Sequence, residues 1–357
     1  MTSPNGWHVW GNDAVVANLR RALAHDHPAH SYLVAGPAGV GKTTLALDLA
    51  MVLVCQDRSR DDPTVACGRC LGCQKVARGV HPDVRMFSLD GQVANEKSRG
   101  KNTTLSIETA REIRASTALR PLEAAWRVLI VDDAETLQGP AQEALLKTLE
   151  EPPLFVVLIM LADDAELLLP TIRSRCQQID LRPVSRTVIE QILAADGVAP
   201  AAAMEIADAA AGLPGWARRA AANRSLVEEK RVQLDEAIAW ISGSQYERIV
   251  SALRTGDRYS KRRDDVFQSL DMLIGVWRDL LLLHGAIAVP VVRGQLRENG
   301  WARLEFFGVQ FPVAAGVVQR HRLRRRAIVV DAGRLEPLRS PRTPGDQHQH
   351  DDESNEM

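Results

Sequence analysis

The chain has 357 residues, of which 45% are hydrophobic and 25% are charged, and this composition excludes a disordered or fibrous protein. At about 150 residues per domain, this length predicts two or three domains. The 44 Lys and Arg residues are balanced by 45 Asp and Glu residues, which gives a net charge of -1. The charge of the whole chain therefore cannot drive nucleic-acid binding, which would need a local basic patch.

The N-terminal segment 1–8 contains no basic region followed by an apolar region, so we expect no secretory leader. The longest unbroken apolar run, 155–162, is much shorter than the roughly 18 residues of a membrane span. We therefore expect a cytoplasmic protein without a membrane partner.

Residues 30–180 are predicted to form an α/β domain. Near-continuous apolar runs, typical of strands buried on both faces, occur at three places: 30–35, 126–132 and 155–161. Helical segments alternate with these runs at 42–54 and at 140–150, where Pro152 and Pro153 end the helix. This alternation indicates a parallel sheet covered by helices on both faces.

The pattern changes after residue 182. The residues that follow show helical periodicity without a strand pattern, and the last stretch is proline-rich and then polar and acidic, as in disordered tails. The sequence therefore predicts four parts: an α/β domain with a phosphate loop (1–182), a small all-α domain (183–240), an all-α C-terminal domain (241–335) and a disordered tail (336–357).

Segment 36–44, Gly-Pro-Ala-Gly-Val-Gly-Lys-Thr-Thr, carries the pattern G-x-x-x-x-G-K-[ST] between a predicted strand and a predicted helix. Its glycines let backbone N–H groups point inward around phosphates, and the helix N-terminus adds the positive end of its dipole. Lys42 would reach the β- and γ-phosphates of ATP, and the Thr43 hydroxyl would bind Mg2+. A glycine-rich turn without a ligand is the alternative. The loop residues assigned to nucleotide binding are Gly36, Gly39, Gly41, Lys42, Thr43 and Thr44.

Asp132 ends the second predicted strand, in the segment Val-Leu-Ile-Val-Asp-Asp. A carboxylate at the end of a buried strand beside a phosphate loop is the Walker B arrangement, in which Asp132 would hold Mg2+. Active ATPases of this type normally have Glu at the next position to polarise the attacking water, whereas this chain has Asp133. Many strands end in Asp, so this interpretation depends on the upstream loop.

Four of the five cysteines are crowded within one short segment, and the last three of them are spaced C-x-x-C-x-x-C. The four are Cys55, Cys67, Cys70 and Cys73. Four thiolates satisfy tetrahedral zinc coordination with no open position, which is typical of a structural site. We therefore expect a zinc module at about 55–73, with unmetallated thiols as the alternative. Cys176 lies outside the cluster and is expected to be a small buried hydrophobic residue.

Segment 171–176 reads Thr-Ile-Arg-Ser-Arg-Cys. The planar fork of a guanidinium suits a transferring phosphoryl group, so Arg175 is a candidate arginine finger, either for its own nucleotide or for that of a neighbouring subunit. The alternative is a structural arginine that pairs with a surface carboxylate.

Three stretches together resemble the AAA+ clamp-loader subunits of bacterial DNA polymerase III: 30–36, 144–153 and 169–176. They read His-Ser-Tyr-Leu-Val-Ala-Gly, Ala-Leu-Leu-Lys-Thr-Leu-Glu-Glu-Pro-Pro and Leu-Pro-Thr-Ile-Arg-Ser-Arg-Cys. The resemblance covers about residues 8–220. It implies an AAA+ domain, a helical lid and a helical collar, which assembles a five-subunit ring with tau/gamma and delta subunits. Such a ring opens the sliding clamp and places it on primed DNA.

Within this family, the segment Val9-Trp10-Gly11 and the stretch 107–114 are similar to the delta-prime branch. The motor subunits usually have a Tyr-Arg-Pro stretch before the phosphate loop, and this chain lacks it. Delta-prime subunits act as the stator of the ring and supply the Ser-Arg-Cys arginine to a neighbour's ATP. The resemblance therefore implies that Arg175 acts in trans, as the only catalytic residue that this chain contributes.

Departures from the motor pattern are consistent with this branch. Besides Asp133, Ala162 and Asp163 stand where a Thr or Asn would face the γ-phosphate, and Gly215 stands where motor subunits carry a lid arginine. The resemblance thus implies that ATP and Mg2+ can bind but that ATPase activity is weak or absent. A catalytic tau/gamma-type subunit, an unrelated AAA+ ATPase and a P-loop kinase are the alternatives. The cysteine cluster between the loop and Asp132 argues against the kinase.

Overall fold

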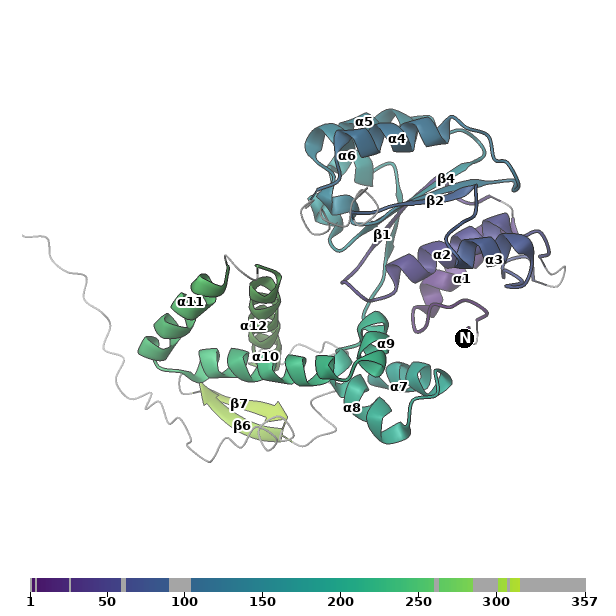
Figure 1. The fold of residues 1–357 in the computed structure, drawn as a ribbon. Coiled ribbons are helices and arrows are strands. Elements are labelled where there is room, and N and C mark those ends of the chain that lie inside the picture. The colour runs from purple at the N-terminus through teal and green to yellow at the C-terminus, as the bar shows by residue number, and fades with distance from the viewer. Residues whose placement is uncertain are drawn as a thin grey trace, which may run out of the picture.

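The computed structural model describes residues 2–3, 5–25, 27–58, 62–89, 104–259, 263–284, 301–306 and 309–314. Its central element is a five-stranded parallel sheet between two layers of helices (Figure 1). The strands are β1 (Ser31–Ala35), β2 (Val84–Phe87), β3 (Arg127–Val131), β4 (Val156–Ala162) and β5 (Gln177–Asp180), in the spatial order β2-β3-β4-β1-β5. Because all four pairings are parallel, each connection must cross over a face of the sheet.

Strands β1, β3 and β4 form the centre of the sheet, and every residue in them is buried. They confirm the three predicted strands to within one residue at each end. Strands β2 and β5 were not predicted from the sequence. Both are four-residue edge strands with a single buried residue each, Phe87 and Ile179, so neither carries a continuous apolar run.

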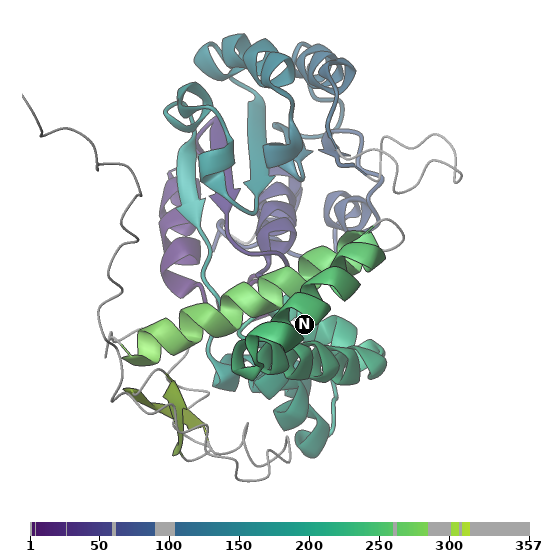
Figure 2. The same cartoon turned by 90° about the vertical axis from the view of Figure 1, so that its left-hand side faces the viewer.

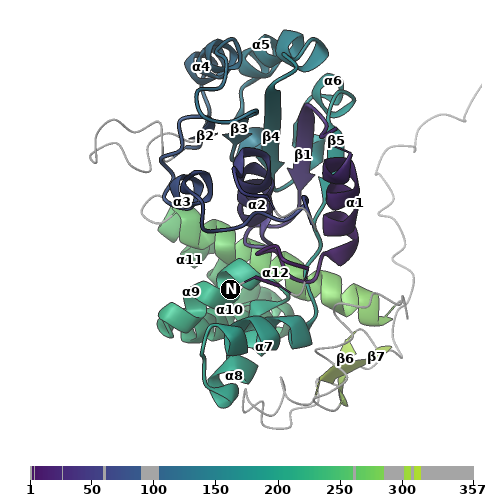
Figure 3. The same ribbon diagram turned by 90° about the vertical axis from the view of Figure 1, so that its right-hand side faces the viewer.

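Helices α1 (Asp13–Ala24), α2 (Lys42–Val54) and α3 (Leu71–Ala77) cover one face of the sheet (Figure 3). Helices α4 (Ile107–Thr117), α5 (Gly139–Glu150) and α6 (Pro170–Arg173) cover the other. Alternate residues of a strand point to opposite faces, so Val128 and Ile130 pack with the first layer while Leu129 and Val131 pack with the second. Two 3-10 turns, Ala134–Thr136 and Ala165–Leu167, follow β3 and β4.

Three helices follow the sheet: α7 (Arg186–Ala195), α8 (Pro200–Ala210) and α9 (Pro214–Ala222). We call residues 186–222 the lid. They have a core of their own, which contains Ile189, Ile192 and Ile206. The Ser185 side chain accepts a hydrogen bond from the Val188 N–H and so caps α7.

Helices α10 (Ser225–Ser242), α11 (Gln245–Tyr259) and α12 (Arg263–His284) come next in the chain (Figure 2). Helix α10 continues across residue 240, where we expected a domain boundary. Strands β6 (Trp301–Phe306) and β7 (Val309–Ala314) then pair in antiparallel fashion. Of the helices in the described part of the chain, none is both long and apolar enough to span a bilayer.

The antiparallel pair corrects the expectation that residues 241–335 are all-α. Polar and apolar residues alternate in Arg303–Phe306 and Val309–Phe311, which is the period of a strand, and Pro312 is unfavourable within a helix. The predicted tail, 336–357, lies outside the described residues.

Candidate functional site

Residues 36–41 join β1 to α2, which begins at Lys42, as the sequence predicts. Gly36 has φ +148° and Gly41 has φ +115°, a region that favours glycine. A Cβ atom at Gly36 would lie 2.5 Å from the Leu181 carbonyl oxygen, so a larger residue cannot occupy this close approach. The loop thus leads into α2, a 13-residue helix whose N-terminus is suited to an anion.

A cavity of about 510 Å3 lies over this loop. Its volume falls within the roughly 300–1,000 Å3 typical of small-molecule sites. The cavity is lined by the N-terminal segment His8–Trp10, the loop residues 38–44, the acidic residues Asp132, Asp133, Glu135 and Asp163, Leu161, and the lid residues Ile192, Pro214, Gly215, Arg218 and Arg219. The structure therefore brings Asp132 and the predicted loop residues, except Gly36, together in one cavity.

The Lys42 side chain is almost completely buried at the base of this cavity. Its Nζ donates a hydrogen bond to the Gly36 carbonyl oxygen at 2.7 Å. It is also ion-paired with Asp163, the residue that follows β4. The ammonium group that a phosphate would contact is therefore already paired within the chain.

Asp132, Asp133 and Glu135 form the acidic wall of the cavity, just after β3. Burial raises the pKa of Asp132, although the hydrogen bond that it accepts from the Asp133 N–H at 3.1 Å acts in the opposite direction. Burial and the neighbouring Asp132 carboxylate raise the pKa of Asp133 to about 6. Carboxylate and hydroxyl oxygens are ligands that Mg2+ prefers, so Asp132 and Thr43 fit the predicted metal.

The lid forms another wall of the cavity. The Gly215 N–H, near the start of α9, donates to the Gly39 carbonyl oxygen at 2.8 Å and so joins the lid to the phosphate loop. Gly215 offers no side chain, as expected, but α9 brings Arg218 and Arg219 to the cavity. Arg218 is ion-paired with Asp196 at 2.7 Å, whereas Arg219 is exposed and forms no ion pair within the described ranges.

Neither arginine was predicted from the sequence as a site residue. They follow Gly215 by three and four positions, and residues at this spacing lie on the same face of a helix. That spacing was the available signal.

Arg175 does not line the cavity. Its Nη2 donates to Glu150 Oε1 at 2.5 Å, and its Nη1 donates to the Thr171 carbonyl oxygen at 2.9 Å. The arginine side chain is 34% exposed and the glutamate side chain 48%. In the single chain, Arg175 is thus held by a surface carboxylate and remains separate from the residues of the phosphate loop.

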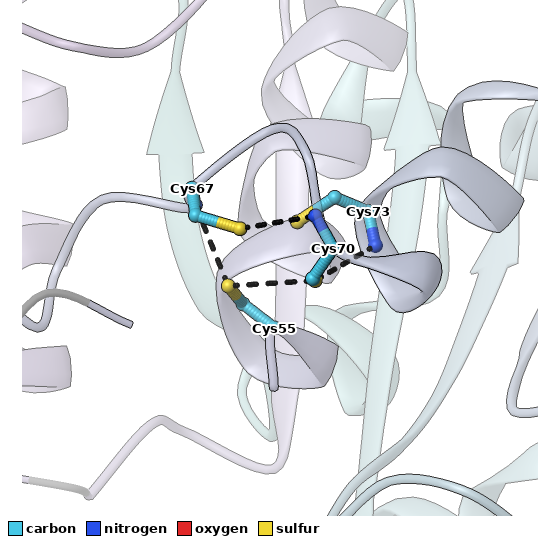
Figure 4. Close-up of side chains that lie close together, drawn as sticks. All are labelled: Cys55, Cys67, Cys70 and Cys73. Atoms are coloured by element: carbon cyan, nitrogen blue, oxygen red, sulfur yellow. Dashed lines mark hydrogen bonds between the residues drawn. The ribbon is translucent and has the colours of Figure 1, made fainter. Parts of the chain in front are cut away.

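The four predicted zinc ligands converge at the end of α2 and the start of α3 (Figure 4). Their sulfur atoms all lie within 4.8 Å of one another, and the Sγ atoms of Cys55 and Cys70 are 3.9 Å apart. Tetrahedral zinc with Zn–S bonds of about 2.3 Å would place its sulfur ligands about 3.8 Å apart. The cluster therefore fits a tetrahedral metal ion.

The backbone around the cluster favours thiolates. The N–H groups of Cys67, Cys70 and Cys73 donate to the sulfur atoms of Cys55, Cys67 and Cys70, respectively, at 3.3–3.4 Å. Burial alone would raise the pKa of Cys70, but hydrogen bonds, chiefly from the Cys73 N–H, lower it to about 6. Burial raises the pKa of Cys55 and of Cys73, so these two thiols lose their protons less readily unless a metal ion binds. Cys176 lies outside the cluster, and burial raises its pKa to about 11, as expected for an inert thiol.

Residues 11–185 match the family described as "DNA polymerase III, delta subunit". A delta' subunit of DNA polymerase III from Pseudomonas aeruginosa is 34% identical over 212 residues, which cover 59% of this chain and 60% of that protein. A gamma subunit from Buchnera aphidicola is 33% identical, with 52% of this chain and 47% of that protein covered. A tau subunit from Bacillus subtilis is 30% identical, with 51% of this chain and 30% of that protein covered. The chain therefore spans between 30% and 60% of the length of these relatives.

Two solved structures from Thermotoga maritima are similar at a lower level. The RuvB Holliday junction branch migration motor has a TM-score of 0.42 at 16% identity, with 87% of this chain and 94% of that chain covered. A protein related to the DNA polymerase III gamma subunit has a TM-score of 0.35 at 18% identity, with 80% of this chain and 86% of that chain covered.

The glycine loop between β1 and α2, together with the carboxylates that follow β3, defines a P-loop protein. The family match and the sequence relatives make this assignment more specific. Residues 11–185 thus belong to the family of DNA polymerase III clamp-loader subunits.

Proposed function

We propose that this chain is the delta-prime (stator) subunit of a DNA polymerase III clamp loader, which helps to load the sliding clamp onto primed DNA during replication. It acts in the cytoplasm, in a five-subunit ring with tau/gamma and delta subunits. Residues 1–182 serve as the AAA+ domain, 183–240 as the lid domain, which includes the lid helices α7 to α9, and 241–335 as the collar. Family membership supports a place in this complex, but the relatives include both delta' and gamma/tau subunits. The choice of branch therefore depends on the site.

The observation that carries this choice is the ion pair between Lys42 and Asp163. In an active ATPase, this lysine contacts the β- and γ-phosphates, and a carboxylate beside it would repel them. The glutamate that usually polarises the attacking water is also replaced by Asp133, whose side chain is one methylene shorter. These features support a cavity that holds nucleotide without efficient turnover.

In this proposal Arg175 acts as an arginine finger on the ATP of a neighbouring subunit. It is partly exposed, lies outside its own cavity, and is oriented by Glu150 and the Thr171 carbonyl group. A guanidinium held in this way at the surface can contact a phosphate across a subunit junction. Its planar fork suits the charge that develops there.

The proposal assigns a structural Zn2+ to Cys55, Cys67, Cys70 and Cys73, and a nucleotide with Mg2+ to the loop cavity. The sulfur geometry supports the zinc site, whose role is to fix the segment between α2 and α3. When bound, Mg2+ would neutralise phosphate charge beside Asp132 and Thr43.

A second cavity supports contact with the phosphates of primed DNA. It has a volume of about 440 Å3, lies between α4 and α5, and has Arg111, Arg114 and Lys147 in its lining, together with Glu151. Three cations in one groove form the local basic patch that a chain without net positive charge needs to bind nucleic acid.

The catalytic tau/gamma-type subunit is the alternative. It is favoured by the intact loop motif and by the two lid arginines at the cavity, Arg218 and Arg219. Steady-state ATP hydrolysis by the purified chain, with and without partner subunits, distinguishes the two functions. We expect the isolated chain to show negligible turnover, whereas turnover typical of ATPases that is lost in Lys42→Ala would favour the tau/gamma alternative.

A further inference from the structure

Lys42 is held on two sides within its own chain. Its Nζ donates to the Gly36 carbonyl oxygen at 2.7 Å and is ion-paired with the Asp163 carboxylate. The lysine side chain is 9% exposed, whereas the aspartate side chain is 53% exposed. The ammonium group is therefore fixed in the loop, while the carboxylate borders solvent and can be displaced.

The register of the sheet places Asp163 beside the loop. Ala35 and Ala162 are opposite each other at the ends of β1 and β4, and the Gly36 N–H donates to the Ala162 carbonyl oxygen at 3.1 Å. The Asp163 N–H in turn donates to Glu135 Oε1 at 3.2 Å. Two strands and a neighbouring carboxylate thus position Asp163, so its contact with Lys42 is part of the fold.

This contact competes with phosphate binding. The lysine of a phosphate loop contacts the β- and γ-phosphates of a nucleotide, and here a carboxylate contacts the same ammonium group. A polyphosphate must displace that carboxylate, which then remains in the cavity beside the phosphates together with Asp133 and Glu135. Phosphate binding therefore breaks one ion pair and adds repulsion between like charges.

We propose that Asp163 determines the nucleotide affinity of this cavity, because it acts as an intramolecular counter-ion of Lys42 that nucleoside di- and triphosphates must displace. This inference rests on the proposed nucleotide site and names the group that controls it. The competition concerns the phosphate groups alone, so a ligand without phosphate is unaffected by it.

The test measures binding of Mg2+-ADP, inorganic pyrophosphate and adenosine to the full chain by titration calorimetry. Asp163→Asn removes the charge and keeps the size of the side chain. We expect this variant to bind ADP and pyrophosphate about tenfold more tightly than the wild type, because a competing, partly buried ion pair is lost. Adenosine binding should not change.

Asp164→Asn is the matched control, because it removes the same charge one residue further on. The Asp164 side chain accepts the Glu166 N–H at 2.8 Å, a bond that Asn can replace, and it does not line the cavity. We expect wild-type affinity for this variant. Thermal melting of each protein establishes that it is folded.

Equal ADP affinity of the wild type and Asp163→Asn, or an equal gain in Asp164→Asn, would overturn the role of Asp163. In that case, the nucleotide site would still be supported if the wild type binds ADP and Lys42→Ala does not. If neither the wild type nor Asp163→Asn binds ADP or pyrophosphate, both the site and the role of Asp163 are refuted. Tighter binding of ADP together with rapid ATP turnover by the wild type would leave this role intact and refute the stator function.

Discussion

Replacement of Arg175 by alanine tests the proposed arginine finger. The change removes the ion pair between Arg175 and Glu150. The arginine side chain is 34% exposed and the glutamate side chain is 48% exposed. Partly exposed pairs of this kind contribute at most about 1 kcal/mol, which corresponds to a melting-temperature change of about 2–4 °C for a domain of this size. The fold and the nucleotide affinity of the isolated chain should therefore be nearly unchanged.

The effect on the assembled loader should be much larger. An arginine finger contributes roughly 10^3–10^5 in rate at the site that it completes. We therefore expect Arg175→Ala to abolish turnover at one ATP site of the ring while the other sites continue to work. DNA-dependent ATPase activity and clamp loading by the reconstituted complex are the measurements. Arg175→Lys should not restore activity, because a point charge lacks the planar fork.

Glu150→Ala is the matched control for Arg175→Ala. It breaks the same ion pair but leaves the guanidinium in place, so the loader should retain most of its activity. Equal losses of ATPase activity in the two variants would show that only the ion pair matters. Unchanged ATPase activity in Arg175→Ala would mean that Arg175 has only a structural role.

Three further predictions concern the metal, the stability of the sheet edge and the lid. The purified chain should contain about one zinc ion, which Cys70→Ser should lose and Cys176→Ser should retain, as measured by metal analysis. Asp83→Asn should lower the free energy of unfolding by about 3 kcal/mol, because the buried Asp83 carboxylate is ion-paired with the buried Arg127 at 3.7 Å and accepts hydrogen bonds from three backbone N–H groups, those of residues 122–124. Burial raises the pKa of Asp83, but these donors outweigh it and hold the pKa below its usual value, so the stabilisation exists above the unfolded-state pKa and is lost as pH falls through the folded-state pKa. The difference between Asp83→Asn and the wild type in urea unfolding should therefore shrink in acid, and a constant difference would contradict this assignment. Arg219→Ala should weaken ADP binding several-fold, by roughly 1 kcal/mol, and an unchanged dissociation constant would exclude Arg219 from the site.

Local patterns in the sequence determined much of this protein. Segment 36–44 predicts a phosphate loop because its glycines, lysine and threonines are close together in the chain, and in the structure it runs from the end of β1 into the first turn of α2. The cysteines of segment 55–73 lie close together in the chain, so little folding is needed to bring their sulfur atoms together. Strands β1, β3 and β4 are buried on both faces and therefore have apolar sequences that can be recognised directly.

The tertiary structure alone decided the contacts within and around the site. Lys42 and Asp163 are 121 positions apart, and only the parallel register of β1 and β4 brings them together. Arg219 reaches the cavity because the lid packs on the phosphate loop, and Arg175 is held by Glu150 because α6 lies against α5. Such contacts depend on strand register and helix packing, which set the distances between remote side chains. No short segment of the sequence encodes those distances.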